Sequence, residues 1–175
     1  MNPVIKQENI SFECKLFTVK NIKALLPDGH EKTFELIDIQ NAVTILPMDE
    51  HGRILFVEQY RIGARNVLLE LPAGKIEAGE DPLLCARREL REETGMDAKE
   101  IRPLGNFYMT PGYANEFMYC FLAKGLFNAP LTPDADEFIN VHKIVVSELP
   151  ELIYSGRIVD GKTLAVLYLA KDQMG

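Results

Sequence analysis

Three glutamates close together in the chain have the type and spacing to bind a metal ion. Glu89, Glu92 and Glu93 lie in a segment that we predict to be helical, where positions i, i+3 and i+4 share one face. Glu89 and Glu93 place two like charges one turn apart, which is mildly unfavourable unless a cation offsets the repulsion. Clustered carboxylate oxygens suit a hard ion such as Mg²⁺ or Mn²⁺. The alternative is a charged face in contact with solvent, which the three glutamates taken alone favour.

The elements around these glutamates can be predicted from local signals. Asp81 can serve as N-cap and Pro82 as the first helical residue, and Gly95 is well placed to end the helix. Leu83, Ala86 and Leu90 share a neighbouring face, which we expect to anchor the helix to a sheet. We expect Cys85, which has no neighbouring base, to serve packing only.

Strand patterns precede and follow this helix. Strands are predicted at 16–26, 32–39, 42–48, 53–61 and 67–74, then a strand, turn and strand over 107–126, and a strand at 139–147, with helical spacing in the tail from Glu148. These patterns predict one α+β domain over residues 1–175, with N-terminal strands in 1–40 and a core in 41–175. The strands within 12–39 are either an extension of the core sheet or a hairpin for dimerisation.

Composition excludes several classes of partner. The net charge of −7 and the lack of a basic stripe argue against nucleic acid. No run of 18 apolar residues is present, and the N-terminus has no apolar region typical of a signal peptide, so we expect neither membrane nor export. Three scattered cysteines indicate reduced thiols in a cytoplasmic protein rather than a disulfide framework or a zinc site.

The glutamates stand within a longer pattern. From Gly74 the sequence reads GKIEAGEDPLLCARRELREETGM, which resembles without a departure the signature of the Nudix hydrolases, Gx5Ex7REUxEExGU, where U is aliphatic. The signature covers residues 74–96, and a weaker resemblance extends over about 50–170. The resemblance implies a Nudix fold, an α/β/α sandwich whose central mixed sheet is flanked by helices, with the N-terminal strands as an antiparallel extension. It also implies metal-dependent hydrolysis of a diphosphate linkage, in which metal ions neutralise the phosphate charge and activate water.

The family's site residues can be carried over to this sequence. Glu89 and Glu93 would be the principal ligands of Mg²⁺, which Mn²⁺ can replace, with Glu92 assisting. The carbonyl of Ala73 would be a further ligand. Arg88 would orient a glutamate, and Glu80 would brace the turn into the helix. The expected catalytic residues are Glu93, Glu92, Glu137 and Arg88.

The flanks of the signature indicate a substrate. EQYR at 58–61, ELPAG at 70–74, a proline sixteen residues after Gly95 and the tail at 155–170 resemble the ADP-ribose pyrophosphatase branch. Enzymes of that branch cut ADP-ribose into AMP and ribose 5-phosphate, and they are usually homodimers. A hydrolase of GDP-mannose or of diverse nucleoside diphosphate sugars is the alternative, and a module that senses ADP-ribose without cutting it belongs to a different class.

Four residues outside the signature follow from the branch resemblance. Arg61 would meet the substrate's phosphates, Glu116 would bind a ribose hydroxyl, and Glu70 would lie at the substrate. Glu137 sits where the branch has a loop carboxylate that serves as metal ligand or general base. Whether Glu137 or a glutamate of the signature is the base stays open.

Overall fold

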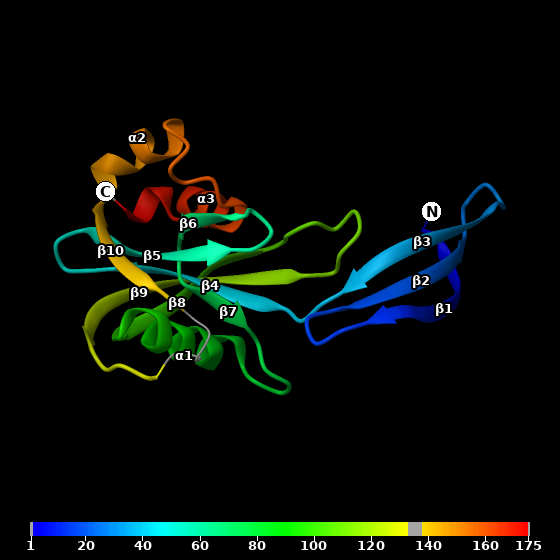
Figure 1. The fold of residues 1–175 in the computed structure, drawn as a ribbon, viewed down its shortest axis with the longest axis horizontal. Coiled ribbons are helices and arrows are strands. Elements are labelled where there is room, and N and C mark those ends of the chain that lie inside the picture. Colours follow the sequence, from blue (N-terminus) through cyan, green and yellow to red (C-terminus); the bar gives the residue numbers. More distant parts are fainter. Residues whose placement is uncertain (1, 133–137, 175) are drawn as a thin grey trace. The chain divides into compact units, whose positions relative to one another are not determined.

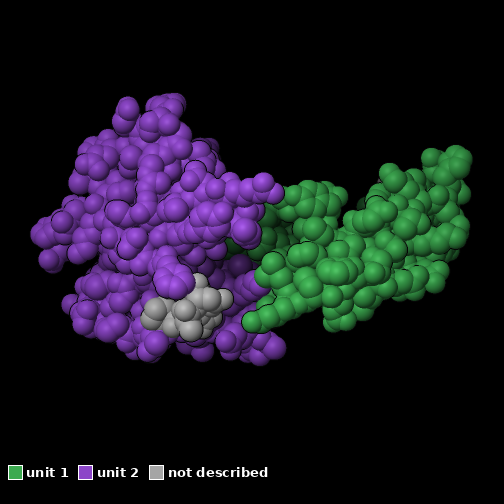
Figure 2. All heavy atoms as spheres, in the orientation of Figure 1, with its two compact units in different colours: residues 1–41, 107–118 green, residues 42–106, 119–175 purple. Residues whose placement is uncertain are grey.

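The chain forms two units, and the smaller one combines the N-terminus with a later segment. The structure is a computed structural model that describes residues 2–132 and 138–174. Unit 1 comprises Met1–Asn41 and Phe107–Met118, and unit 2 comprises Ala42–Asn106 and Tyr119–Gly175 (Figure 2).

Unit 1 contains a three-stranded antiparallel sheet. Its strands are β1 (Val4–Glu13), β2 (Thr18–Leu25) and β3 (Glu31–Asp38), in that spatial order. Lys20 on the central strand forms ion pairs with Glu8 at 2.9 Å and with Asp38 at 2.5 Å, so one lysine links all three strands. The strands expected at 16–26 and 32–39 are confirmed by β2 and β3.

Residues 107–118 join unit 1 through β3. The Ile37 N–H donates to the Tyr113 carbonyl at 2.8 Å, and the Asn115 N–H donates to the Ile37 carbonyl at 3.2 Å. The Asn115 side chain also donates to Asp38 Oδ1 at 2.6 Å. These bonds satisfy the edge of β3 that faces away from β2.

Unit 2 is built around a seven-stranded sheet with the order β10-β5-β4-β9-β8, where β6 pairs with β5 and β7 with β4 (Figure 1). Its strands are β4 (Ala42–Met48), β5 (Arg53–Arg61), β6 (Asn66–Glu70), β7 (Ala73–Lys75), β8 (Met96–Tyr108), β9 (Phe117–Asn128) and β10 (Asn140–Val145). The last two residues of β8 and the first two of β9 belong to unit 1.

Helices cover both faces of this sheet. They are α1 (Pro82–Thr94), α2 (Leu149–Tyr154) and α3 (Gly161–Leu169), with short 3-10 turns η1 (Val146–Glu148) and η2 (Lys171–Gln173). Figure 1 shows α1 on one side of the sheet and α2 and α3 on the other. The expected α+β class, with an α/β/α arrangement around a central mixed sheet, is therefore confirmed. No helix in residues 2–132 or 138–174 is long and apolar enough to cross a membrane.

The helix α1 packs on β4 through a narrow apolar stripe. Cys85, Ala86 and Leu90 are fully buried against Val43 and Ile45. The expectation that Leu83 belongs to this stripe is wrong, because Leu83 is 40% exposed. At 100° per residue, Leu83 lies about a quarter turn from the centre of the buried stripe.

Candidate active site

Both ends of α1 are fixed by the residues that the sequence indicated. Asp81 Oδ1 accepts hydrogen bonds from the N–H groups of Leu83 at 2.9 Å and Leu84 at 3.3 Å. Pro82 occupies the first turn, and Gly95 ends the helix with φ of 70°. Both caps satisfy terminal backbone groups, so the start and the end of α1 are well defined.

Two carboxylates of this helix are buried. Glu89 is 7% exposed and Glu93 is 5% exposed. The Ala73 N–H on β7 donates to Glu93 Oε2 at 3.1 Å. A Cβ at Gly74 would overlap the Glu89 carboxyl group, so the missing side chain makes the room that Glu89 occupies. The two signature glutamates therefore face β7, where Gly74 has no side chain and the Ala73 N–H is free to bond Glu93.

Arg88 connects three glutamates of the signature, Glu80, Glu89 and Glu92. Its Nε and Nη2 each donate to one oxygen of Glu80 at 2.9 Å. Its Nη1 donates to Glu89 Oε1 at 2.6 Å and to Glu92 Oε2 at 2.9 Å. The hydrogen bonds from Arg88 are the main cause that lowers the pKa of Glu80 to about 2, and those with Glu80 also raise the pKa of Arg88. One guanidinium thus contacts three carboxylates, and it keeps Glu80 in the charged state.

The donor set fits a hard divalent ion in its chemistry. Glu89, Glu92 and Glu93 offer carboxylate oxygens, and the carbonyl of Ala73 belongs to the strand that Glu93 contacts. Within residues 2–132 and 138–174, no three histidine, cysteine, aspartate or glutamate side chains are arranged to hold a metal ion. Glu137 lies outside the described residues. The assignment of ligands therefore stays a prediction.

Arg61 lies beside Glu70 at the junction of β5 and β6. Its Nε donates to Glu70 Oε1 at 2.6 Å and its Nη2 to Glu70 Oε2 at 3.0 Å. Burial lowers the pKa of Arg61, but the hydrogen bond to Glu70 and the charges of Glu70, Glu93 and Asp160 raise it overall. Arg61 is therefore held by Glu70, and the charge of Glu93 from the signature helix contributes to its raised pKa.

Sequence reasoning missed the residues that hold Glu70. The Lys162 ammonium forms an ion pair with Glu70 Oε2, and the Thr163 hydroxyl accepts from the N–H of Leu71 at 2.9 Å. Both residues belong to α3, more than ninety positions later in the chain. The signal that could have revealed them is the run Asp-Gly-Lys-Thr at 160–163, in which a lysine stands at the start of a helix.

The other residues expected at the site are placed as follows. Ala73, Arg61, Glu70 and the signature residues all belong to unit 2. Glu116 belongs to unit 1, where its carbonyl accepts from the Met109 N–H at 3.1 Å. Cys85 is fully buried, and burial raises the pKa of its thiol, in agreement with the packing role expected for it.

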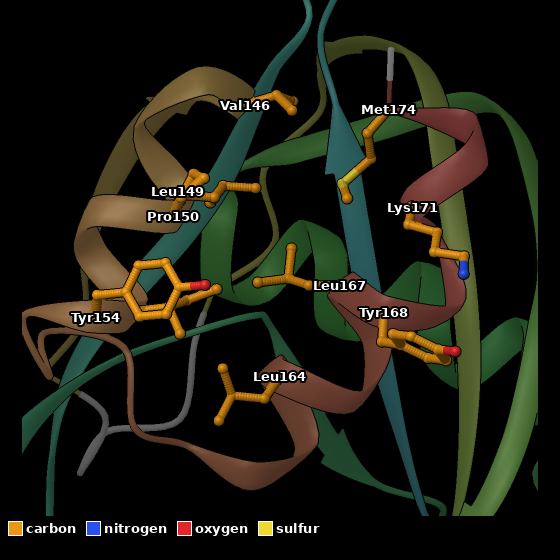
Figure 3. A pocket seen from close by; sticks show the side chains of 10 residues that line it. Val146, Leu149, Pro150, Tyr154, Leu164, Leu167, Tyr168, Lys171 and Met174 are labelled. Atoms are coloured by element: carbon orange, nitrogen blue, oxygen red, sulfur yellow. The ribbon is translucent and has the colours of Figure 1, made fainter.

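A separate cavity of about 640 Å³ lies between α2 and α3 (Figure 3). Its lining is mostly apolar and contains none of the residues that the sequence assigned to a site. The lining residues are Val146, Leu149, Pro150, Ile153, Tyr154, Leu164, Leu167, Tyr168, Lys171 and Met174.

Several known proteins are similar to this chain in sequence or in fold. An ADP-ribose pyrophosphatase from Bacillus subtilis (strain 168) is 37% identical over 147 residues, which cover 82% of this chain and 80% of the relative. A methanol dehydrogenase activator from Bacillus methanolicus is 36% identical over 168 residues, which cover 94% of this chain and 90% of the relative. A solved structure described as an ADP compounds hydrolase has the same fold, with a TM-score of 0.89 and 22% identity over 99% of this chain and 95% of that one.

The family is shown by the extent of the match. The model of the NUDIX domain matches residues 38–165, which include the whole signature and both residues of the Arg61–Glu70 pair. Together with the relatives above, this match shows that the chain belongs to the NUDIX domain family and is a Nudix hydrolase.

Proposed function

We propose that this chain hydrolyses the diphosphate linkage of ADP-ribose and releases AMP and ribose 5-phosphate. The observation that carries the proposal is the buried pair Glu89 and Glu93, with Arg61 held by Glu70 on the sheet whose Ala73 N–H bonds Glu93. A diphosphate needs its negative charge neutralised before water can attack and the leaving group can depart. Carboxylates that hold a cation, next to an arginine, supply that neutralisation.

The metal is the first part of the proposal. Nudix hydrolases generally need divalent metal ions, and Mg²⁺, with Mn²⁺ as substitute, fits the oxygen donors of this site. Glu89 and Glu93, assisted by Glu92 and the Ala73 carbonyl, would hold it. When bound, the ion would neutralise phosphate charge and lower the pKa of a coordinated water.

The remaining roles belong to the chain's own side chains. Arg88 orients Glu89 and Glu92 through its hydrogen bonds to their carboxylate oxygens. Arg61 would bind the diphosphate with the part of its guanidinium that Glu70 does not occupy, and Glu116 would bind a ribose hydroxyl. Glu137 would act as metal ligand or general base, with a signature glutamate as the alternative base.

The choice of ADP-ribose is supported by the relative from Bacillus subtilis and by the flanking motifs EQYR and ELPAG. GDP-mannose and other nucleoside diphosphate sugars share the diphosphate chemistry, so they are the alternative substrates. A module that only senses ADP-ribose would bind the same ligand without cutting it.

The test is a panel of substrates. The purified chain is incubated with ADP-ribose, GDP-mannose and UDP-glucose, each with Mg²⁺, Mn²⁺ or EDTA, and products are identified by mass. Glu93→Gln should lose the activity, whereas Glu77→Gln, an exposed glutamate of the same segment, should keep it. Metal-dependent release of AMP from ADP-ribose supports the proposal. Preferred cleavage of GDP-mannose selects the alternative, and binding of ADP-ribose without cleavage selects the sensor.

A second candidate function follows from the relative in Bacillus methanolicus. That protein is named as a methanol dehydrogenase activator, and its match covers 94% of this chain. We therefore propose activation of an alcohol dehydrogenase as the second function. Purified methanol dehydrogenase is assayed with and without this chain and with Glu93→Gln. A rate increase that the variant does not give would support activation through the hydrolase site, and an unchanged rate would exclude it for that dehydrogenase.

We also propose that the chain acts as a homodimer in the cytoplasm without nucleic acid. The exposed apolar side chains of β1 and the branch resemblance support the dimer. Three cysteines that form no disulfide among the described residues support a reducing compartment, and the net charge of −7 disfavours a nucleic-acid partner.

A further inference from the structure

Lys162 stands where a lysine is normally unfavourable. It lies in the first turn of α3, where the helix dipole repels a cation, and its side chain is only 10% exposed. A buried ammonium is costly unless it is paired with anions. Two carboxylates compensate for it, since Lys162 Nζ pairs with Glu70 Oε2 and lies 3.1 Å from Asp160 Oδ2.

Glu70 is shared between two cations. Its carboxylate is fully buried and accepts both bonds from Arg61 as well as the bond from Lys162. Because Lys162 and Arg61 share the neutralisation of Glu70, part of the positive charge of Arg61 stays available to an anion. Without Lys162, Arg61 would be the remaining described cation on this buried carboxylate.

The first turn of α3 also holds the backbone next to Glu70. The Thr163 hydroxyl accepts from the Leu71 N–H and donates to Asp160 Oδ2 at 2.6 Å. Asp160 in turn caps the helix by accepting from the Thr163 N–H at 2.9 Å. Glu70 is therefore fixed through its side chain by Lys162 and through the following peptide by Thr163.

We propose that Lys162 is a positioning residue for the hydrolysis, which it serves by holding Glu70 so that Arg61 presents its guanidinium to the substrate's diphosphate. The inference rests on the proposed function for the substrate that Arg61 meets. It gives the start of α3 a role in the site, although Lys162 lies 92 positions from Glu70 in the sequence.

The kinetic test compares Lys162→Met with Lys162→Arg, which keeps the charge and restores a donor to Glu70. On ADP-ribose with Mg²⁺, Lys162→Met should lower kcat/KM by about 10- to 100-fold, mostly through KM, and Lys162→Arg should recover most of it. Lys171→Met, which removes an exposed lysine close to the end of α3, is the matched control and should behave like the unchanged protein. Thermal unfolding of each variant reports on the fold.

A double-mutant cycle separates action through Arg61 from direct contact with substrate. In an Arg61→Lys background, Glu70 keeps a cation, so Lys162→Met should cause little further loss. If the full loss recurs in that background, or if Lys162→Met alone leaves kcat/KM within twofold of the unchanged protein, the inference is overturned.

A spectroscopic test is independent of catalysis. The Arg61 Nε–H signal in a ¹H–¹⁵N spectrum should shift in Lys162→Met, because Arg61 is then the remaining described cation on Glu70, and return in Lys162→Arg. An unchanged signal in Lys162→Met overturns the positioning role even if the protein cuts no substrate. Loss of the proposed function would instead appear as absence of hydrolysis by the unchanged protein, with the spectral response intact.

Discussion

At the scale of single residues, Gly74 matters for the atoms that it lacks. A Cβ there would overlap the carboxyl carbon and both carboxylate oxygens of Glu89. Oε1 of this carboxylate is bonded to Arg88, so moving the group away costs that bond. The glycine that begins the signature is therefore required by the position of a glutamate fifteen residues later.

Gly74→Ala should consequently displace Glu89. We expect a loss of hydrolysis of about 100-fold and a loss of unfolding free energy of about 1–3 kcal/mol from overpacking. Steady-state kinetics and urea unfolding measure both effects. Gly63→Ala is the control, because a Cβ there meets nothing within 4 Å. Normal activity in Gly74→Ala would show that Glu89 has another place to go.

Glu80 gives the fold a dependence on pH. Its pKa is lowered from 4.5 to about 2 in the folded chain, mainly by the hydrogen bonds from Arg88. A lowered folded pKa means that the stabilisation is fully present above the unfolded pKa and is lost as the pH falls from about 4.5 to 2. Glu80→Gln removes this contribution.

The difference in unfolding free energy between the unchanged protein and Glu80→Gln should therefore be largest at neutral pH and shrink towards pH 2. Urea unfolding at a series of pH values tests this. A difference that stays constant over that range would contradict the assignment of the titration to Glu80.

At the scale of elements, β4 is buried along its whole length, and Thr44 lies in the middle of it. Within the described part of the chain, the Thr44 hydroxyl is a buried side-chain group with no hydrogen-bond partner. Thr44→Val keeps the branched shape that suits a strand and removes the unpaired hydroxyl, so we expect a gain of about 1 kcal/mol in unfolding free energy. Urea unfolding measures it, and a decrease would indicate that the hydroxyl does find a partner in solution.

Elements with local signals at both ends were predictable, and those without were not. The helix α1 was placed correctly because Asp81 and Gly95 satisfy its caps. The first part of β8 was missed since Pro103 and Gly105 interrupt its strand pattern. The single strand expected at 67–74 is two strands, β6 and β7, separated by Leu71 and Pro72. The strand β1 was not predicted because polar residues dominate its middle.

The site residues likewise divide into those with a local sequence signal, which could be predicted, and those without one. The signature residues could be found because their spacing is set within one loop and one helix. The Glu70–Lys162 pair could not, because it depends on tertiary packing between β6 and α3. Arg61 and Glu70 were each expected at the substrate, but only the structure shows that they bind each other.

At the scale of the whole molecule, unit 1 buries too few apolar side chains to stabilise its sheet by itself. All ten residues of β1 are exposed, including Val4, Ile5, Ile10 and Phe12. Small sheets need an apolar face covered by another element, and exposed apolar patches mark interaction sites. A second copy of the chain is the partner that we propose for this strand.

The double variant Ile10→Asp with Phe12→Asp should therefore raise the dimer dissociation constant by at least about tenfold, since burying new charge costs more than 1.4 kcal/mol. Sedimentation or light scattering over a concentration series measures it. Asn9→Asp, an exposed polar change on the same strand, is the control. A variant that remains as dimeric as the unchanged protein would exclude β1 from the interface, and a monomeric unchanged protein would exclude the dimer.

Unit 1 is built from two separate segments of the chain, and this has a consequence for its biosynthesis. The backbone bonds between Ile37 and residues 113–115 join positions 76 or more apart. As the ribosome releases the chain from its N-terminus, β3 is complete long before its second neighbour exists. Until then its outer edge offers open N–H and C=O groups, so we expect this edge to be exposed to mispairing with other nascent chains during translation.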